Sequence, residues 1–143
     1  MRTSNPVRSL VFVLVAATLA LPLIPTRGAD YPPMPPPGEK VPIGDGQYLV
    51  YGFDKAPKLG TSIMRVEIFN REGKRDTSLH VKADAGMPSM RGAHETGERA
   101  FQLSRKGIYL LPIPIVMPGE WEVRFTVSRG EAVIFRGGYT FDV

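Results

Sequence analysis

The chain of 143 residues contains no cysteine. Disulfide bonds therefore cannot stabilise it, an anchor through a lipidated cysteine is excluded, and no cysteine nucleophile is available. A domain of about 100 residues can still fold on its hydrophobic core alone, provided that most of its strands bury one face. The absence of cysteine thus predicts an ordinary packed core.

Recognisable catalytic motifs are also missing. The two histidines, His80 and His94, are not spaced as in the metal-binding motifs that place two ligands on one helix turn. No serine lies between two glycines in the pattern of a nucleophile elbow, and no glycine-rich loop ends in Lys-Ser or Lys-Thr to bind phosphate. We therefore expect a protein without enzymatic activity.

An excess of charge of one sign is lacking once the N-terminus is set aside. The whole chain has 18 basic and 14 acidic residues, but positions 1–29 hold three arginines and no acid. The remainder keeps 15 basic and 14 acidic residues, a net charge of +1. This balance gives no electrostatic argument for binding nucleic acid or an anionic membrane.

The chain has one long hydrophobic run, and it lies at the N-terminus. Leu10 to Ile24 is an apolar run uninterrupted by any charged residue, and it follows a start that carries Arg2 and Arg8. As a helix the run would span about 22 Å, which is short of the roughly 30 Å of a bilayer core. We interpret residues 1–29 as a secretory signal peptide, with cleavage after Ala29, an earlier cut after Ala20, or retention as an anchor as the alternatives. The expected location is periplasmic or secreted, and contact with the membrane is expected only if this segment is retained.

Proline is concentrated in the next segment. Six prolines fall between Asp30 and Gly44, and consecutive prolines favour an extended polyproline conformation. Residues 30–46 are therefore predicted to be a semi-rigid spacer, with a ligand for a partner's aromatic groove or an ordered first strand as alternatives. The folded domain is predicted to cover residues 47–143.

Short stretches of alternating apolar and polar residues fill that domain. In the clearest stretch, "WEVRFTV", Trp121, Val123, Phe125 and Val127 face one way and the polar residues face the other. About seven such stretches, separated by turn residues, predict an all-β, immunoglobulin-like antiparallel sandwich. Pro112 and Pro114 predict an edge strand or a break in the strand, and Gly137 and Gly138 predict a bulge or bend in the last strand.

Most of the candidate metal ligands of the chain lie in the stretch "DAGMPSMRGAHETG". Met87, Met90 and His94 lie within eight residues, and Met117 follows in "VMPGEW". Thioether and imidazole groups are ligands that soft Cu(I) prefers, so these four residues form a candidate metal site. The alternatives are that the methionines fill gaps in the core, as methionine often does, or that the loop contacts another protein.

The order of these pieces resembles the YtkA-like family of small exported or tethered β-sandwich domains, which is related in pattern to the periplasmic part of FixH-type proteins. The resemblance rests on "MPSMRGAH", "KGIYLLPIPIVMPGEW" and the closing "YTFDV". It implies an immunoglobulin-like sandwich and an association with copper handling or cytochrome oxidase assembly.

Two functions are therefore consistent with the sequence. The first is a non-enzymatic domain that binds or delivers Cu(I) in the cell envelope, to a partner such as a copper-receiving or oxidase-assembly protein. The second is a metal-free accessory or interaction domain of an envelope complex, which would use the same loop and the edge strand around Pro112.

Overall fold

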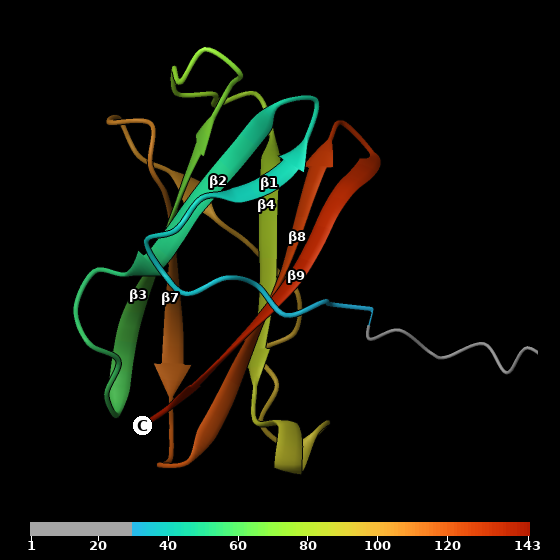
Figure 1. Cartoon of the computed structure of the whole chain (residues 1–143). Helices are drawn as coiled ribbons and strands as arrows, with labels where there is room; N and C mark the ends of the chain where they lie inside the picture. Colours follow the sequence, from blue (N-terminus) through green and yellow to red (C-terminus); the bar gives the residue numbers. More distant parts are fainter. Residues whose placement is uncertain (1–29) are drawn as a thin grey trace, which may run out of the picture.

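The computed structural model describes residues 30–143, so the predicted signal peptide lies outside the described residues. These residues form two antiparallel sheets packed face to face (Figure 1). The strands are β1 (Val41–Gly44), β2 (Gln47–Phe53), β3 (Gly60–Phe69), β4 (His80–Gly86), β5 (Arg99–Ala100), β6 (Gln102–Leu103), β7 (Tyr109–Ile115), β8 (Glu120–Arg129) and β9 (Ala132–Asp142). The predicted all-β sandwich is confirmed, with nine strands where about seven were expected: β1 lies before the predicted domain, and one expected stretch forms the two short strands β5 and β6.

The order of the strands defines two layers. One sheet has five strands in the order β1-β2-β3-β7-β6, and the other has four in the order β5-β4-β8-β9. Within residues 30–143, no helix has the length and apolar character needed to cross a bilayer.

The core lies between the sheets and follows the alternation of the sequence. On β8, Trp121, Val123, Phe125 and Val127 are all buried, as the pattern predicts. From the opposite sheet, β3 contributes Met64, Val66 and Ile68, each fully buried. Burial of a large apolar side chain stabilises the fold by roughly 1.5–3 kcal/mol, so these two strands supply much of the stability.

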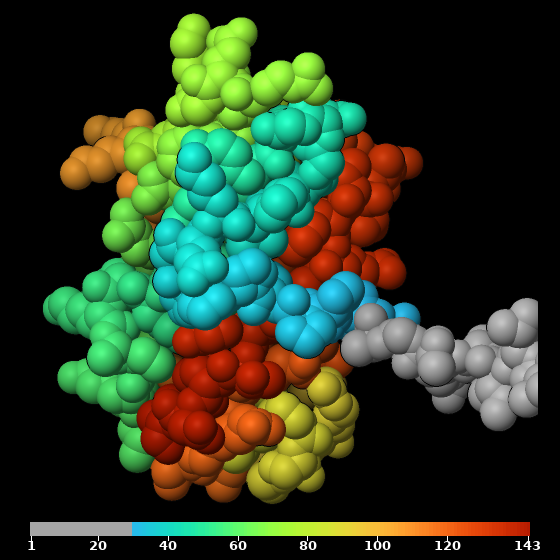
Figure 2. Space-filling model, in the orientation of Figure 1, coloured from blue at the N-terminus to red at the C-terminus, as the bar shows by residue number. Residues whose placement is uncertain are grey.

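The proline-rich segment is part of the fold, which corrects the boundary predicted at Gln47. Val41 and Ile43 on β1 are buried, and β1 pairs with β2. Further upstream, the amide of Met34 donates to the carbonyl of Gly138 at 2.9 Å, and the amide of Gly138 donates to the carbonyl of Pro32 at 2.8 Å. Figure 2 shows this N-terminal segment lying against β9. Residues 32–46 are therefore ordered on the sandwich, as the alternative of an ordered first strand predicts, and are not a spacer.

The two glycines near the C-terminus make this contact possible. A Cβ atom on Gly137 would lie 2.7 Å from the sulfur of Met34 and 2.8 Å from Cζ of Phe135, so any larger residue here would require these side chains to move. The bulge predicted at these glycines lies elsewhere: the β8–β9 register shifts between Val127 and Ser128, opposite Phe135 and Val133. Gly137 and Gly138 instead allow the N-terminal segment to pack closely against β9.

The predicted edge position of the proline strand is confirmed. β7 pairs with β3 along Tyr109–Ile115, whereas β6 covers only Tyr109 and Leu110 on its other side. Pro112 and Pro114 therefore lie where β7 has no second neighbour, and their missing amide donors cost the sheet no hydrogen bond.

Candidate functional site

The candidate donors lie on a loop that leaves β4 and returns to it. Two hydrogen bonds close the loop: the amide of Thr96 donates to the carbonyl of Ala85 at 2.8 Å, and the amide of Ala85 donates to Oγ1 of Thr96 at 3.0 Å. Between these residues, Pro88–Met90 forms a single 3₁₀ turn, η1. Proline at its first position suits this turn, because its fixed φ is already helical and its missing amide is not needed there. We call residues 87–97 the donor loop.

Met87 packs inward from the donor loop and belongs to the core. Its side chain is only 6% exposed, and its methyl carbon lies 3.0 Å from the position that a Cβ on Gly119 would occupy. Gly119 has a φ of +128°, a region that favours glycine, and it follows Met117 by two residues. The structure therefore brings Met87 against the β7–β8 turn that contains Met117, although 30 residues separate the two methionines.

Met117 itself is half-buried and packs against the edge of the core. Its carbonyl accepts a hydrogen bond from Nε1 of Trp121 at 3.0 Å, which satisfies the polar atom of a side chain that is 1% exposed. Trp121 thus fixes the turn from within, and its predicted packing role is confirmed.

His94 and Met90 occupy the neck and the tip of the donor loop. His94 is half-buried, and its carbonyl lies 3.5 Å from the position that a Cβ on Gly86 would occupy. Because Gly86 immediately precedes Met87, the backbones at positions 87 and 94 lie on the two sides of the loop neck. Met90, in η1, is 37% exposed. All four predicted donors thus lie at one end of the sandwich, with Met90 the most exposed, and their joint role as metal ligands stays a prediction.

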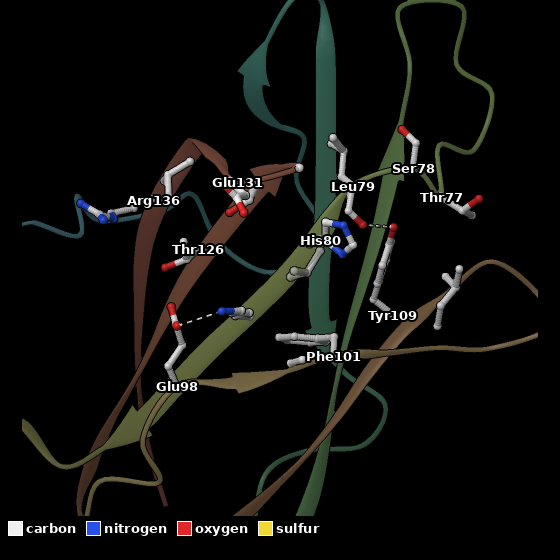
Figure 3. A pocket seen from close by; sticks show the side chains of 17 residues that line it. Thr77, Ser78, Leu79, His80, Glu98, Phe101, Tyr109, Thr126, Glu131 and Arg136 are labelled. Carbon is white, nitrogen blue, oxygen red and sulfur yellow. Dashed lines mark hydrogen bonds and ion pairs between the residues drawn. The ribbon is translucent and has the colours of Figure 1, made fainter.

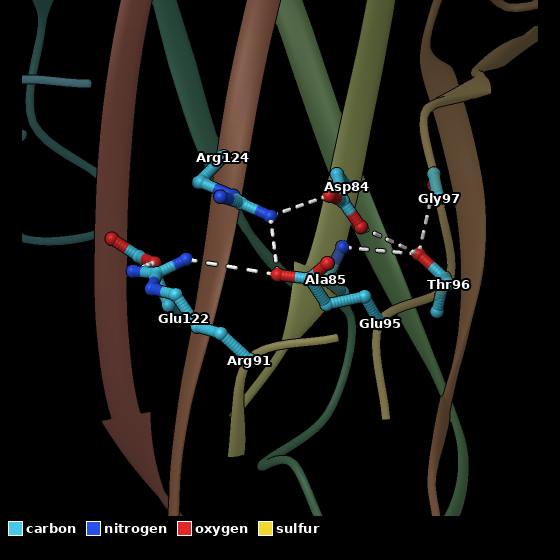
Figure 4. A network of polar contacts seen from close by, with 8 residues as sticks. All are labelled: Asp84, Ala85, Arg91, Glu95, Thr96, Gly97, Glu122 and Arg124. Atoms are coloured by element: carbon cyan, nitrogen blue, oxygen red, sulfur yellow. Dashed lines mark hydrogen bonds and ion pairs between the residues drawn. The ribbon is translucent and has the colours of Figure 1, made fainter. Parts of the chain in front are cut away.

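A network of ion pairs holds the donor loop against β4 and β8 (Figure 4). Arg124 Nη2 lies 2.5 Å from Oδ2 of Asp84 and 2.9 Å from Oε1 of Glu95. Arg91 Nη2 lies 2.6 Å from Oε2 of Glu122, and Arg91 Nη1 lies 3.8 Å from Oε1 of Glu95. The pairs Arg91–Glu122 and Glu95–Arg124 therefore tie the donor loop to β8.

The electrostatics of the network centre on Arg124. Burial alone would lower the pKa of the Arg124 guanidinium, but the negative charges of Asp84 and Glu95 outweigh burial and raise the pKa above its ordinary value. Tyr31 adds a cation–π contact, with its ring centroid 5.7 Å from Cζ of Arg124. Arg124 is thus a permanently charged centre that the carboxylates neutralise.

This network was not predicted from the sequence. Asp84 and Arg124 are direct partners in the β4–β8 register, and so are Gly86 and Glu122. Outward-facing charges on predicted strands are ordinary, and nothing in their spacing along the chain says which strands are neighbours. The pairing of β4 with β8 in this register is what brings the charged side chains together.

A separate hollow of about 640 Å³ lies beside the outer face of the four-stranded sheet (Figure 3). Its lining includes His80, Thr126, Glu131 and Arg136, together with an ion pair between Lys82 and Glu98 at 3.3 Å. His80 is exposed, as the alternation predicts. In the part of the chain that the structure describes, no three His, Cys, Asp or Glu side chains gather as metal ligands.

The fold and the site together define a two-layer β-sandwich with a Met- and His-bearing loop at one end. No protein-family model matches the chain, and no curated protein matches it. The chain is similar in structure to FetP of uropathogenic E. coli strain F11, crystallised "as isolated" after recombinant expression in the periplasm of E. coli BL21(DE3), with a TM-score of 0.53 and 16% sequence identity. The match covers 76% of this chain and 95% of that one, and it shows a shared fold.

Proposed function

We propose that the protein is a non-enzymatic domain of the cell envelope that binds or delivers Cu(I) through Met87, Met90, His94 and Met117. The observation that carries the proposal is the contact between Met87 and Gly119, which joins the donor loop to the turn that bears Met117. Thioether and imidazole donors suit Cu(I), so the residues present fit this cargo. Export rests on the signal-like segment 1–29, and the shared fold with a protein expressed in the periplasm agrees with it.

The placement of the donors suggests how the cargo would move. Met90, the most exposed of the four, would meet Cu(I) or a partner first, while Met87 and Met117 would hold the ion from the protein side. Transfer would then proceed by ligand exchange, in which the thioethers are replaced one at a time by donors of the partner. The ion pairs of Arg91 and Arg124 would keep the donor loop in place between these events.

The test is a titration of the purified protein with Cu(I) against a competing chelator. Met87→Leu and Met90→Leu remove the sulfurs but keep apolar side chains of similar size, so the fold should survive. We expect the double variant to lose at least about tenfold in affinity, which corresponds to roughly 1.4 kcal/mol. Met64→Leu, a fully buried methionine on β3, is the matched control and should bind as the unmodified protein does. Equal uptake by all three proteins would remove the proposal.

A second candidate function is a metal-free interaction domain of an envelope complex. It is favoured by the ion pairs of the donor loop and by the burial of Met87, because both order the loop without a metal. Amide hydrogen exchange separates the two functions. Under the second function, the donor loop exchanges equally slowly with and without Cu(I), whereas a bound ion would slow exchange around Met87 and His94.

A further inference from the structure

Strand β7 is apolar on both of its faces. Its inward side chains, Tyr109, Leu111, Ile113 and Ile115, are buried in the core. Its outward positions are also apolar, and we call them the β7 stripe: Leu110, Pro112, Pro114 and, just beyond the strand, Val116. An antiparallel strand with one face in water normally alternates, and an unbroken apolar run is typical of a strand covered on both faces. The outer face of β7 therefore has the composition of a covered surface.

A groove of about 730 Å³ runs beside the stripe on the outer face of the five-stranded sheet. Its apolar lining is Ile63, Ile108, Leu110 and Pro112. Ile63 lies directly opposite Pro112 in the β3–β7 register, so the two strands form one apolar floor. At the other end of the stripe, Val116 is 62% exposed. The apolar surface thus extends from the β6–β7 turn to the turn that bears Met117.

The charges around this groove are mainly positive. Arg65, Arg105 and Lys106 contribute to its lining, and Asp54 is the one acid in it. Arg65 is paired with Glu67 at 3.3 Å. Among residues 30–143, neither Arg105 nor Lys106 takes part in an ion pair. Two unneutralised cations at the β6–β7 turn therefore favour an occupant that is acidic at that end.

The backbone of β7 limits how an occupant can bind. Pro112 and Pro114 have no amide to donate, and Arg99 Nη1 donates to the carbonyl of Pro112 at 3.4 Å. A partner strand added to this edge would lack donors to pair with, so sheet extension is disfavoured. Binding must instead use the side chains of the outer face.

We propose that the groove and the β7 stripe bind an extended segment of a partner protein in which acidic residues adjoin one end of a short apolar run. From Leu110 to Val116 the stripe spans about 20 Å, the length of roughly six extended residues. The apolar run covers the stripe, and the acidic end meets Arg105 and Lys106. This inference deepens the second candidate function, rests on it, and does not depend on Cu(I).

The test is a titration of the isotope-labelled protein, followed by NMR, with two end-blocked peptides. One is Glu-Asp-Leu-Val-Leu-Val, and the other replaces the acids by two lysines. The acidic peptide should shift the amides of Ile63, Arg65 and Leu110 and bind at least about tenfold more tightly than the basic one. The double variant Arg105→Glu/Lys106→Glu should reverse this preference.

Controls keep the result specific. Lys82→Glu/Arg136→Glu makes the same change of charge on the opposite sheet and should leave binding unchanged. Leu110→Ser, or Val116→Ser if the first variant unfolds, should weaken binding of the acidic peptide. Equal binding of the two peptides, or shifts confined to the other sheet, would overturn the proposal. So would a concentration-dependent dimer that Leu110→Ser abolishes, since the occupant would then be a second copy of the chain. Loss of Cu(I) binding in the titration above has no bearing on these outcomes.

Discussion

At the scale of single residues, the contact between Met87 and Gly119 decides how the donor loop sits on the sandwich. Gly119 has a positive φ, which favours glycine, and an added Cβ would lie 3.0 Å from the methyl carbon of Met87, so a larger residue would crowd this contact. The turn is further fixed by two hydrogen bonds between Gly119 and Val143, at 2.8 and 3.1 Å. A small change at this residue should therefore affect both the turn and the loop.

Gly119→Ala should lower the free energy of unfolding by about 1–3 kcal/mol, because it adds backbone strain and a collision with Met87. Urea denaturation measures this loss. Gly60→Ala is the control: Gly60 also has a positive φ, +103°, but nothing lies within 4 Å of its added Cβ. The control should lose less, and an equal loss in the two variants would show that contact with Met87 contributes nothing.

At the scale of elements, Asp76 orders the segment between β3 and β4 by accepting hydrogen bonds from Ser78 in that segment and from Gln47 on β2. Its Oδ1 accepts hydrogen bonds from the amide of Ser78 at 2.9 Å and from the hydroxyl of Ser78 at 2.6 Å, and Gln47 Nε2 donates to its Oδ2 at 2.5 Å. The hydrogen bonds from Ser78, followed by that from Gln47, outweigh burial and lower the pKa of Asp76. The ionised carboxylate is therefore the form that the fold stabilises.

Asp76→Asn should flatten the dependence of stability on pH in the acid range. With a folded-state pKa below the unfolded value of about 3.9, Asp76 contributes stability that is present above that value and lost as the pH falls through the folded pKa. The free energy of unfolding, measured at pH 7 and at pH 3, should differ less in the variant than in the unmodified protein. Glu131→Gln, an exposed change in the β8–β9 turn, is the control. An unchanged difference in Asp76→Asn would contradict this role.

The N-terminal segment is the second element whose position depends on identifiable contacts. Its hydrogen bonds to Gly138 make it an added edge for β9, and the hydroxyl of Tyr51 donates to the carbonyl of Pro35 at 2.6 Å. Gly137 permits this packing because it has no side chain. The segment covers an edge that would otherwise be open to pairing with other chains.

Gly137→Ala should displace this segment, because the new methyl group would overlap the side chain of Met34. Faster amide hydrogen exchange at Met34 and Gly138 would report the displacement. The double variant Gly137→Ala/Met34→Ala removes the overlap with Met34 and leaves that with Cζ of Phe135, at 2.8 Å, so exchange at positions 34 and 138 should be slower than in the single variant. If the single variant exchanges as slowly as the unmodified protein, the close approach at Gly137 is not what positions the segment.

Alternation of side chains allowed the core of β3, β4 and β8 to be predicted, since period two requires only local sequence. The turn at Asp45 and Gly46, which joins β1 to β2, is a local hairpin signal that the spacer prediction overlooked. Residues 32–34 were misassigned because their contacts with β9 lie more than 100 residues away, and no local pattern reveals them. The same reason applies to the site. The four donors could be named from residue chemistry, but the packing of Met87 on Gly119 and the pairing of Asp84 with Arg124 depend on strand register.

At the scale of the whole molecule, the sandwich separates two surfaces. One end carries the donor loop, and the outer face of the five-stranded sheet carries the β7 stripe. Val116 ends the stripe one residue before Met117, so a partner bound along β7 would lie next to the proposed copper site. This arrangement would suit a protein that hands its cargo to a docked partner.

X-ray absorption spectroscopy at the copper edge, on the purified protein loaded with one equivalent of Cu(I), tests the proposed copper site most directly. We predict a first shell that contains both sulfur and imidazole nitrogen, with sulfur reduced in Met87→Leu/Met90→Leu and imidazole scattering lost in His94→Ala. A first shell of light atoms alone, or one that none of these substitutions alters, would contradict the assignment of Cu(I) to this end of the molecule.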